Sequence, residues 1–198
     1  MSDPHQARAR PAILTRLNED HQRLARVLNA FELECLALDS DAGPNFELLR
    51  DILDYVQSFP DTIHHPTEDA LFDYLVLNAS LSASEEAAIA DNRAQHEELI
   101  ESTGILLGMI DRVFAGADLD LAYLKLTMNN YLVEQRRHME FENSRLFPMA
   151  EKRLSDPDWK VIEIQLKLKQ AKDPLFDAYD EQYEALRRYI EMQHAPTA

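Results

Sequence analysis

Two copies of a histidine–glutamate pair constrain this chain more than any other feature. The histidine precedes the glutamate by four residues in each, at His64 and Glu68 and again at His138 and Glu142. On an α-helix, residues four apart share one face, so an imidazole and a carboxylate with this spacing converge on one point. Both pairs lie on stripes of apolar residues spaced three and four apart. Because a carboxylate is costly to bury without a partner or a metal, each pair predicts a polar site inside a helical core.

The apolar periodicity predicts four long helices joined by short connections. The second helix contains Pro60 and Pro66, each of which removes a backbone donor, so we expect a kink there. Ser82 and Glu85 have the spacing of a capping box and predict the start of the third helix. The first helix is expected from Pro11 to Leu38 and the second from Phe46 to near residues 78–80. The third should begin after Ser82 and end at Gly116, and Asp118 or Asp120 can cap the fourth, which continues through Met149. Long helices with short connections predict an all-α, up-down four-helix bundle.

The two histidine–glutamate pairs belong to an internal repeat. A lone histidine on an apolar stripe precedes each pair, at His21 and His96. The separation is 43 residues from His21 to His64 and 42 residues from His96 to His138. The chain therefore resembles two helical hairpins with equivalent polar positions, which an up-down bundle would bring together in its core.

The six repeated residues form a plausible set of metal ligands. Four imidazoles, two bridging carboxylates and one oxo or hydroxo group would make two metal ions five-coordinate, with one open position on each. Such ligation suits non-haem iron, with manganese next, whereas zinc prefers closed four-coordinate sites. Any one of these histidines alone is more often a hydrogen-bonded core residue, but matching positions on four helices are hard to explain independently. The predicted metal ligands are His21, His64, Glu68, His96, His138 and Glu142.

Several nearby residues receive other interpretations. His65 follows His64 and should point about 100° away from it on an α-helix, so we expect it to support the ligands or face solvent. Tyr131 and Gln135 share the stripe of His138 and are candidates to support the site, although ordinary packing explains Tyr131 equally well. Cys35, the only cysteine, lies on an apolar stripe and is interpreted as a core residue and not as a reactive thiol.

Composition limits the classes of partner. The formal net charge of −16 argues against binding to nucleic acid or to an anionic membrane surface. No apolar run approaches the roughly 20 residues that span a bilayer, and no secretory signal is visible, so a cytoplasmic location is expected. We expect a disordered lead-in over residues 1–10, the bundle over 11–154, and additional C-terminal helices over 155–198 that pack on the bundle. The oligomeric state is left open.

At its motifs the sequence resembles the hemerythrin-like family, also called the HHE cation-binding domain. The resemblance covers roughly residues 12–150, and a C-terminal segment beginning at Asp173-Pro174 is similar to the tail of bacterial members. It implies a four-helix bundle with an oxo-bridged di-iron centre, whose terminal ligands would be the four histidines and whose bridges would be the two glutamates. The motifs are Asp20-His21, His64-His65-x-x-Glu68-Asp69, Gln95-His96 and His138-x-x-x-Glu142-Asn143.

Two departures separate this chain from the oxygen-carrying members. Asn92 stands where those proteins have a fifth histidine, and Glu142 replaces an aspartate that follows its histidine by five residues. The four-histidine, two-glutamate set instead resembles bacterial iron-centre repair proteins and stress or iron-sensing domains. The cysteine-bearing N-terminal domain of those repair proteins is not in this sequence.

The leading hypothesis is a non-haem di-iron protein that binds or reacts with oxygen, nitric oxide or hydrogen peroxide, in stress response or in iron and redox handling. Manganese or zinc could substitute for iron. A second hypothesis is an iron or redox sensor, or an iron donor, without catalytic turnover. A third is an oxidase or peroxidase for an organic substrate, for which the sequence identifies no pocket, and a fourth is a structural bundle with vestigial ligands. No catalytic residue is assigned, and whether the protein is an enzyme is left open.

Overall fold

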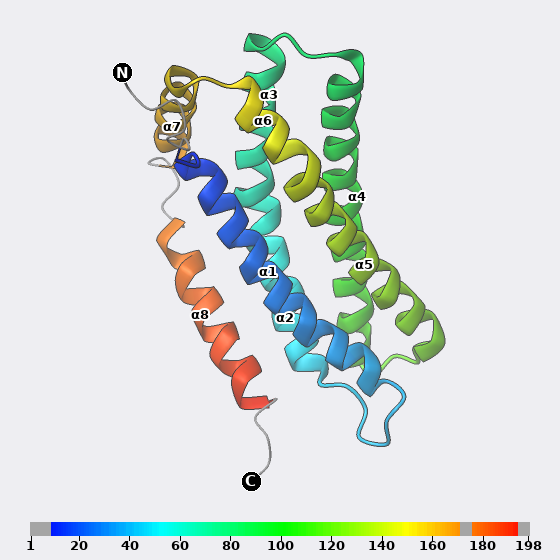
Figure 1. The fold of residues 1–198 in the computed structure, drawn as a ribbon. Helices are drawn as coiled ribbons and strands as arrows, with labels where there is room; N and C mark the ends of the chain where they lie inside the picture. The colour runs from blue at the N-terminus through cyan, green and yellow to red at the C-terminus, as the bar shows by residue number, and fades with distance from the viewer. Residues whose placement is uncertain (1–8, 171–175, 194–198) are drawn as a thin grey trace.

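All regular secondary structure in residues 9–170 and 176–193, which the computed structural model describes, is helical (Figure 1). This confirms the predicted all-α class. The α-helices are α1 (Ala12–Ala37), α2 (Phe46–Ser58), α3 (His65–Asn78), α4 (Ala83–Phe114), α5 (Leu121–Phe141), α6 (Phe147–Arg153), α7 (Asp156–Gln170) and α8 (Phe176–Gln193). Two π-helical turns connect consecutive α-helices: η1 (Pro60–His64) between α2 and α3, and η2 (Glu142–Leu146) between α5 and α6.

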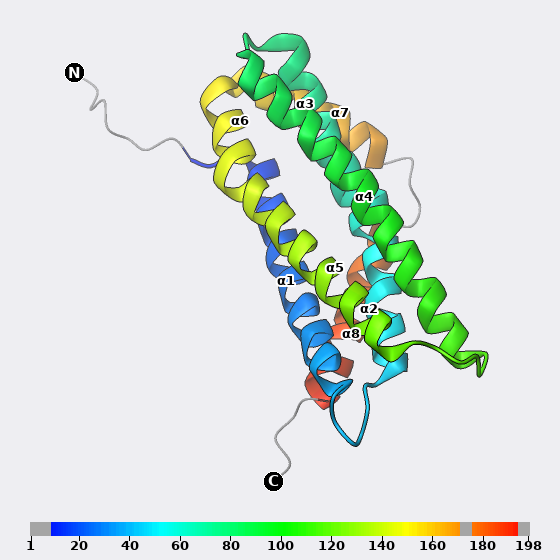
Figure 2. The ribbon, with the colours of Figure 1, turned by 90° about the vertical axis from the view of Figure 1, so that its right-hand side faces the viewer.

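The helices form an up-down bundle with two additional helices on its outside. Its four rods are α1, the continuous α2–η1–α3 segment, α4, and the continuous α5–η2–α6 segment (Figures 1 and 2). Helix α7 packs on α3 near one end, and α8 lies along α1 and α2. The additional C-terminal helices therefore pack on the bundle. The exact domain boundaries stay a prediction, since most of residues 1–10 and the expected helix start at Asp173-Pro174 lie outside the described residues.

Local signals account for the ends of the helices. The Glu85 carboxylate accepts a hydrogen bond from the Ser82 backbone N–H at 2.8 Å, as expected for the predicted capping box at the start of α4. The Asp120 side chain accepts from the first backbone N–H groups of α5. Gly116 follows α4 with φ of 70°, a left-handed conformation that favours glycine. None of the described helices is long and apolar enough to cross a bilayer.

The predicted kink in the second rod is a π turn. Pro60 starts it, and the N–H groups of His64 and His65 donate to carbonyls five residues earlier, at Phe59 and Pro60. The Thr67 hydroxyl donates to the Ile63 carbonyl at 2.6 Å, close to Pro66, which has no N–H to donate. A π turn contains one more residue than an α turn, so it rotates the following residues relative to an unbroken α-helix. Such turns are frequent at functional sites.

The interior is divided into two apolar clusters by a polar layer. One cluster, which includes Leu28, Ile52 and Met128, fills the end of the bundle near the α1–α2 loop. It also contains Cys35, in agreement with the interpretation of that residue as part of the core. The other cluster, which includes Leu14 and Phe147, fills the opposite end beneath α7. The buried polar residues in between carry the candidate site.

Candidate metal centre

All six predicted ligands are buried in the polar layer, and every rod of the bundle contributes. None is more than 4% exposed. His21 comes from α1, His64 from the end of η1, Glu68 from α3, His96 from α4, His138 from the end of α5, and Glu142 from the start of η2. The up-down topology therefore brings together positions that are more than 120 residues apart in the chain.

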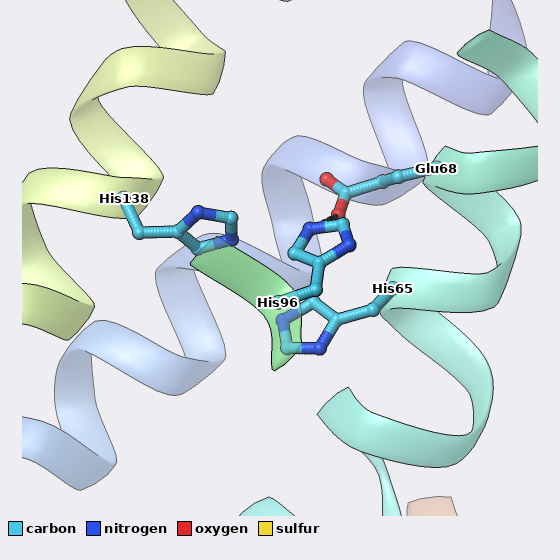
Figure 3. Close-up of side chains that lie close together, drawn as sticks. All are labelled: His65, Glu68, His96 and His138. Atoms are coloured by element: carbon cyan, nitrogen blue, oxygen red, sulfur yellow. Dashed lines mark ion pairs between the residues drawn. The ribbon is translucent and has the colours of Figure 1, made fainter. Parts of the chain in front are cut away.

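The six predicted ligands, together with His65, form two groups that share Glu68. We call His21, His64, Glu68 and Glu142 the first cluster, and His65, Glu68, His96 and His138 the second cluster. Within each cluster, one ligand-type atom per residue lies within 4.8 Å of the others. Figure 3 shows the second cluster: His65 and Glu68 extend from α3 toward His96 of α4 and His138 of α5. Each cluster has the residue types and the spacing to hold a metal ion.

Each of the two carboxylates lies close to histidines of both clusters. Glu68 Oε1 lies 3.3 Å from His64 Nε2 and 3.6 Å from His21 Nε2, whereas Glu68 Oε2 lies 3.5 Å from His96 Nε2. Glu142 Oε2 lies 3.1 Å from His21 Nε2, and Glu142 Oε1 lies 3.3 Å from Nε2 of both His96 and His138. Each glutamate thus has one oxygen for each group of histidines.

The donor atoms fit metal ions better than they fit one another. The Nε2 atoms of His21 and His138, both oxygens of Glu68 and Oε2 of Glu142 are buried and make no hydrogen bond within the described part of the chain. Buried polar groups are nearly always hydrogen-bonded, so several such atoms facing one point need another explanation. Imidazole nitrogen and carboxylate oxygen are ligands of iron, manganese and zinc, and a cation would satisfy all of these atoms together.

The pKa values in the polar layer are set by burial and by the short distances between the histidines and the carboxylates. Burial acts to raise the pKa of Glu68, but the neighbouring histidines outweigh it and hold that pKa well below its usual value. Burial likewise acts to lower the histidine pKa values, but the carboxylates raise the pKa of His21 to about 9 and that of His64 to about 10. The pKa of His138 is instead lowered, because burial dominates there. The layer can therefore neutralise its carboxylates with either protons or cations.

The second ring nitrogen of each predicted histidine ligand faces an oxygen from a different rod. Nδ1 of His64 lies 3.5 Å from Asp20, and Nδ1 of His96 lies 3.4 Å from Asp69. The corresponding oxygens for His138 and His21 belong to Gln95, at 3.2 Å, and Asn143, at 3.1 Å. These four residues, which we call the outer partners, connect the rods in a closed ring. Because they face Nδ1, they let Nε2 of each histidine point to the middle of the polar layer, and they fix the orientation of the ring. Metal-binding histidines require both.

The outer partners were not identified as functional from the sequence, although a signal was present. Each directly precedes or follows a predicted ligand: Asp20 precedes His21, Gln95 precedes His96, Asp69 follows Glu68, and Asn143 follows Glu142. Adjacent residues on a helix point in different directions. A polar residue beside an inward ligand therefore points toward the neighbouring rod.

His65 is not solvent-facing. It is 2% exposed, and its ring stacks on that of His96 with 4.1 Å between centroids. The expectation of a solvent-facing side chain assumed an unbroken α-helix, but the π turn η1 changes the rotation of the chain just before α3. His64 and His65 consequently both face the interior.

Tyr131 and Gln135 belong to a separate hydrogen-bonded chain. Gln135 Nε2 donates to the Tyr131 hydroxyl at 3.1 Å, and that hydroxyl lies 3.1 Å from the Thr103 hydroxyl. Burial raises the pKa of Tyr131, which keeps its hydroxyl protonated. These hydrogen bonds satisfy the Tyr131 hydroxyl beside the polar layer, whereas Oε1 of Gln135 makes no hydrogen bond within the described residues. A supporting role for both residues stays a prediction.

Asn92 lies at the edge of the second cluster. It is fully buried, and its Nδ2 lies 3.2 Å from His96 Nε2. Its Oδ1 makes no hydrogen bond within the described residues. Asn92 lies one turn before His96 on the same face of α4, so its side chain also reaches the second cluster.

Comparison with known families gives one match. The model of the hemerythrin HHE cation-binding domain matches residues 12–150, which span α1 through most of α6 and contain every residue of both clusters. No curated protein and no solved structure gave a significant match. With a family match over more than two thirds of the chain, a helical bundle and two buried groups of histidine and glutamate, this chain belongs to the hemerythrin HHE family of helical, cation-binding domains.

Proposed function

We propose that this protein binds two iron ions, one at each cluster, through His21, His64, Glu68, His96, His138 and Glu142. The observation that carries the proposal is the arrangement of the two glutamates, each of which has one oxygen near each group of histidines. A single metal site would leave one oxygen of each buried carboxylate without a partner. Two ions use all four oxygens and compensate the buried negative charge.

The ligand set favours iron, with manganese or zinc as substitutes. Mixed imidazole and carboxylate ligation with open positions is typical of non-haem iron sites. When bound, the two ions would supply redox and Lewis-acid chemistry to a small ligand. The protein would contribute the oriented imidazoles, the bridging carboxylates and an apolar surrounding that limits the size of what enters.

Cavities at the surface of the bundle approach the polar layer from outside. One has a volume of about 190 Å³ and lies between α1, the π turn η1 and α7. Leu17 and Ile63 line it, and it reaches Asp20, whose carboxylate faces His64. The described residues that line this cavity include none of the predicted ligands, and it ends at Asp20 behind His64, whereas a second cavity of about 370 Å³ is lined by Gln95, Leu99 and His138. The buried polar layer suits a molecule the size of oxygen, nitric oxide or hydrogen peroxide. We propose these as the ligands, in stress response or in iron and redox handling in the cytoplasm.

Metal analysis combined with optical spectroscopy tests the proposal. Protein purified from iron-replete cells is expected to contain two irons per chain and to show the absorption of an oxygen-bridged iron pair. Addition of nitric oxide or peroxide should change that spectrum. A Glu140→Ala variant serves as the control, because Glu140 is exposed and lies between His138 and Glu142 in the sequence. A folded protein that takes up no iron would contradict the proposal.

The polar layer also favours a second candidate, an iron or redox sensor without turnover. Glu68 and Glu142 are fully buried between two apolar clusters, so the stability of the bundle should depend on what compensates their charge. Occupancy of the site would then change the exposure of α3, which carries Glu68, and of η2, which carries Glu142. A sensor should show a large change in hydrogen exchange on iron removal and no catalytic consumption of peroxide, whereas a reactive centre should consume it.

A further inference from the structure

We propose that His65 is a further metal ligand, which gives the second cluster a third imidazole that the first cluster lacks. This inference rests on the proposed function, because it assigns a residue to one of the two proposed ions. It also predicts that the two ions differ in how accessible they are to an external ligand.

The position of His65 fits a ligand. Its side chain is 2% exposed, and a ring nitrogen lies within 4.8 Å of ligand-type atoms of Glu68, His96 and His138. Its ring stacks on His96 and meets His138 edge-on, with 5.5 Å between the latter centroids and an interplanar angle of 87° (Figure 3). A nitrogen of His65 is therefore close enough to join the second cluster; since its ring is stacked on that of His96, ligation of one ion by both requires one of the rings to turn.

His65 also has the same kind of outer contact as the four predicted histidine ligands. Its Nδ1 lies 3.6 Å from Oδ1 of Asp61, one turn earlier in the π turn. Asp61 is nearly buried, and neither of its carboxylate oxygens makes a hydrogen bond within the described residues. A carboxylate beside Nδ1 leaves Nε2 for a metal, as in the carboxylate–histidine–metal arrangement. All five imidazoles of the layer thus have an oxygen on the outside and the cluster on the inside.

Backbone geometry explains why two consecutive histidines can both serve as ligands. His64 ends η1 and His65 begins α3, so the π turn widens the chain at this point. Pro66 directly follows and cannot donate an N–H to the preceding turn. The wide turn therefore lets His64 face the first cluster while His65 faces the second.

The assignment makes the two metal positions unequal. His21 and His64 serve the first position, whereas His65, His96 and His138 serve the second, and the two glutamates supply an oxygen to each. The second position then has five protein donors and the first has four. The first ion then keeps more open positions for an external ligand. An external ligand should therefore bind the ion at the first cluster.

A His65→Phe variant tests the assignment, because phenylalanine keeps a flat ring against His96 but has no nitrogen. We expect the variant to keep roughly half of the wild-type iron, and its Mössbauer spectrum to lose the component of one ion. His64→Phe, the same change one residue earlier, should remove the other component. Tyr74→Phe on α3 is the control for the fold, since its hydroxyl contacts Asp158 outside the layer, and it should keep both ions.

Two further results separate the possible failures. If His65→Phe does not fold, His65→Gly with added imidazole replaces it, and recovery of iron and of the wild-type spectrum on adding imidazole supports ligation. Wild-type iron content and an unchanged spectrum in His65→Phe, or in His65→Gly without imidazole, would overturn the His65 assignment and leave the proposed function intact. A wild-type protein that cannot hold two ions would overturn the proposed function itself.

Discussion

The two helical hairpins of the bundle supply matching histidines and glutamates but differ in what surrounds them. Each provides a lone histidine, a histidine–glutamate pair and a π turn at the pair. In the first hairpin the π turn precedes the glutamate and ends at His64. In the second hairpin it begins at Glu142 itself. The first hairpin therefore brings in an additional histidine, His65, whereas the second brings Asn143 to the back of His21.

The outer partners differ in the same way. The first hairpin supplies the carboxylates Asp20 and Asp69, with Asp61 in the same role behind His65, whereas the second supplies the amides Gln95 and Asn143. A carboxylate behind an imidazole raises its basicity more than an amide does, and the pKa values of His64 and His96 rise to about 10 and about 11. The two halves of the repeat thus keep the same positions for histidine and glutamate, but the residues behind the histidines carry charge in one half and none in the other.

Removal of the metal should have the largest effect, because it acts on both hairpins. Chelation leaves the charges of the layer compensated by protons alone, and ligand linkage at a thousandfold excess over Kd is worth about 4 kcal/mol of stability. We expect a lower Tm, measured by circular dichroism, together with faster hydrogen exchange in η1 and η2. Equal Tm values with and without metal would mean that packing of the apolar ends alone holds the hairpins together.

Loss of a bridging glutamate should abolish most metal binding from either hairpin. Glu68→Ala and Glu142→Ala each remove an oxygen from both positions, so both variants should lose most of their iron, as measured by elemental analysis. The exposed Glu140→Ala variant provides the matched control and should load normally. Full occupancy in either glutamate variant would show that the corresponding carboxylate is not a bridge.

Loss of a terminal histidine should affect one position more than the other. His21→Ala is expected to empty the first position, and His138→Ala the second, with roughly half of the iron retained in each. Nitric oxide should still bind to His138→Ala but not to His21→Ala, because the first position has fewer protein donors than the second when His65 is a ligand. The reverse pattern in the optical titration would assign the open position to the second hairpin.

The metal-free protein should lose stability at alkaline pH. The pKa values of His21, His64 and His96 lie above the usual histidine value of 6.5, at about 9, 10 and 11. Their protonated forms stabilise the fold fully below pH 6.5, and this contribution is lost as the pH rises through 9 to 11. The Tm of the metal-free protein should therefore fall between pH 7 and pH 10. If the Tm of the metal-loaded protein falls in the same way, bound metal does not replace the protons of these histidines.

The smallest effect is expected from the outer partners. Asp20→Asn keeps an oxygen near His64 but removes its charge, and should weaken metal binding about 10-fold, the lower end of the range for such residues. Asn143→Asp adds the corresponding charge behind His21. It should strengthen binding or leave it unchanged. Competition with a chelator measures both variants, and equal affinities for Asp20→Asn and wild type would mean that the charge difference between the hairpins is without consequence.

Much of this molecule follows from local regularities of the sequence. Alternating three- and four-residue spacing predicts the four rods, because that spacing places apolar side chains on one face of an α-helix. The same spacing places His21, Glu68 and Glu142 on inward faces, where the structure has them. Capping signals such as Ser82 with Glu85 locate a helix end because they depend on residues only three apart.

Features that depend on contacts between rods could not be predicted in the same way. Asp20 contacts His64 and Asn143 contacts His21 across 44 and 122 residues of chain, and no local pattern states which helices are neighbours. His65 is the clearest case, because its direction depends on whether the chain at Pro60 makes an α turn or a π turn. The sequence by itself determined the helices and the six inward polar positions through their short-range periodicity. The tertiary structure alone decided the π turns, the pairing of each imidazole with an outer oxygen, and the place of His65, since these depend on how the rods pack and how their backbone hydrogen bonds are satisfied.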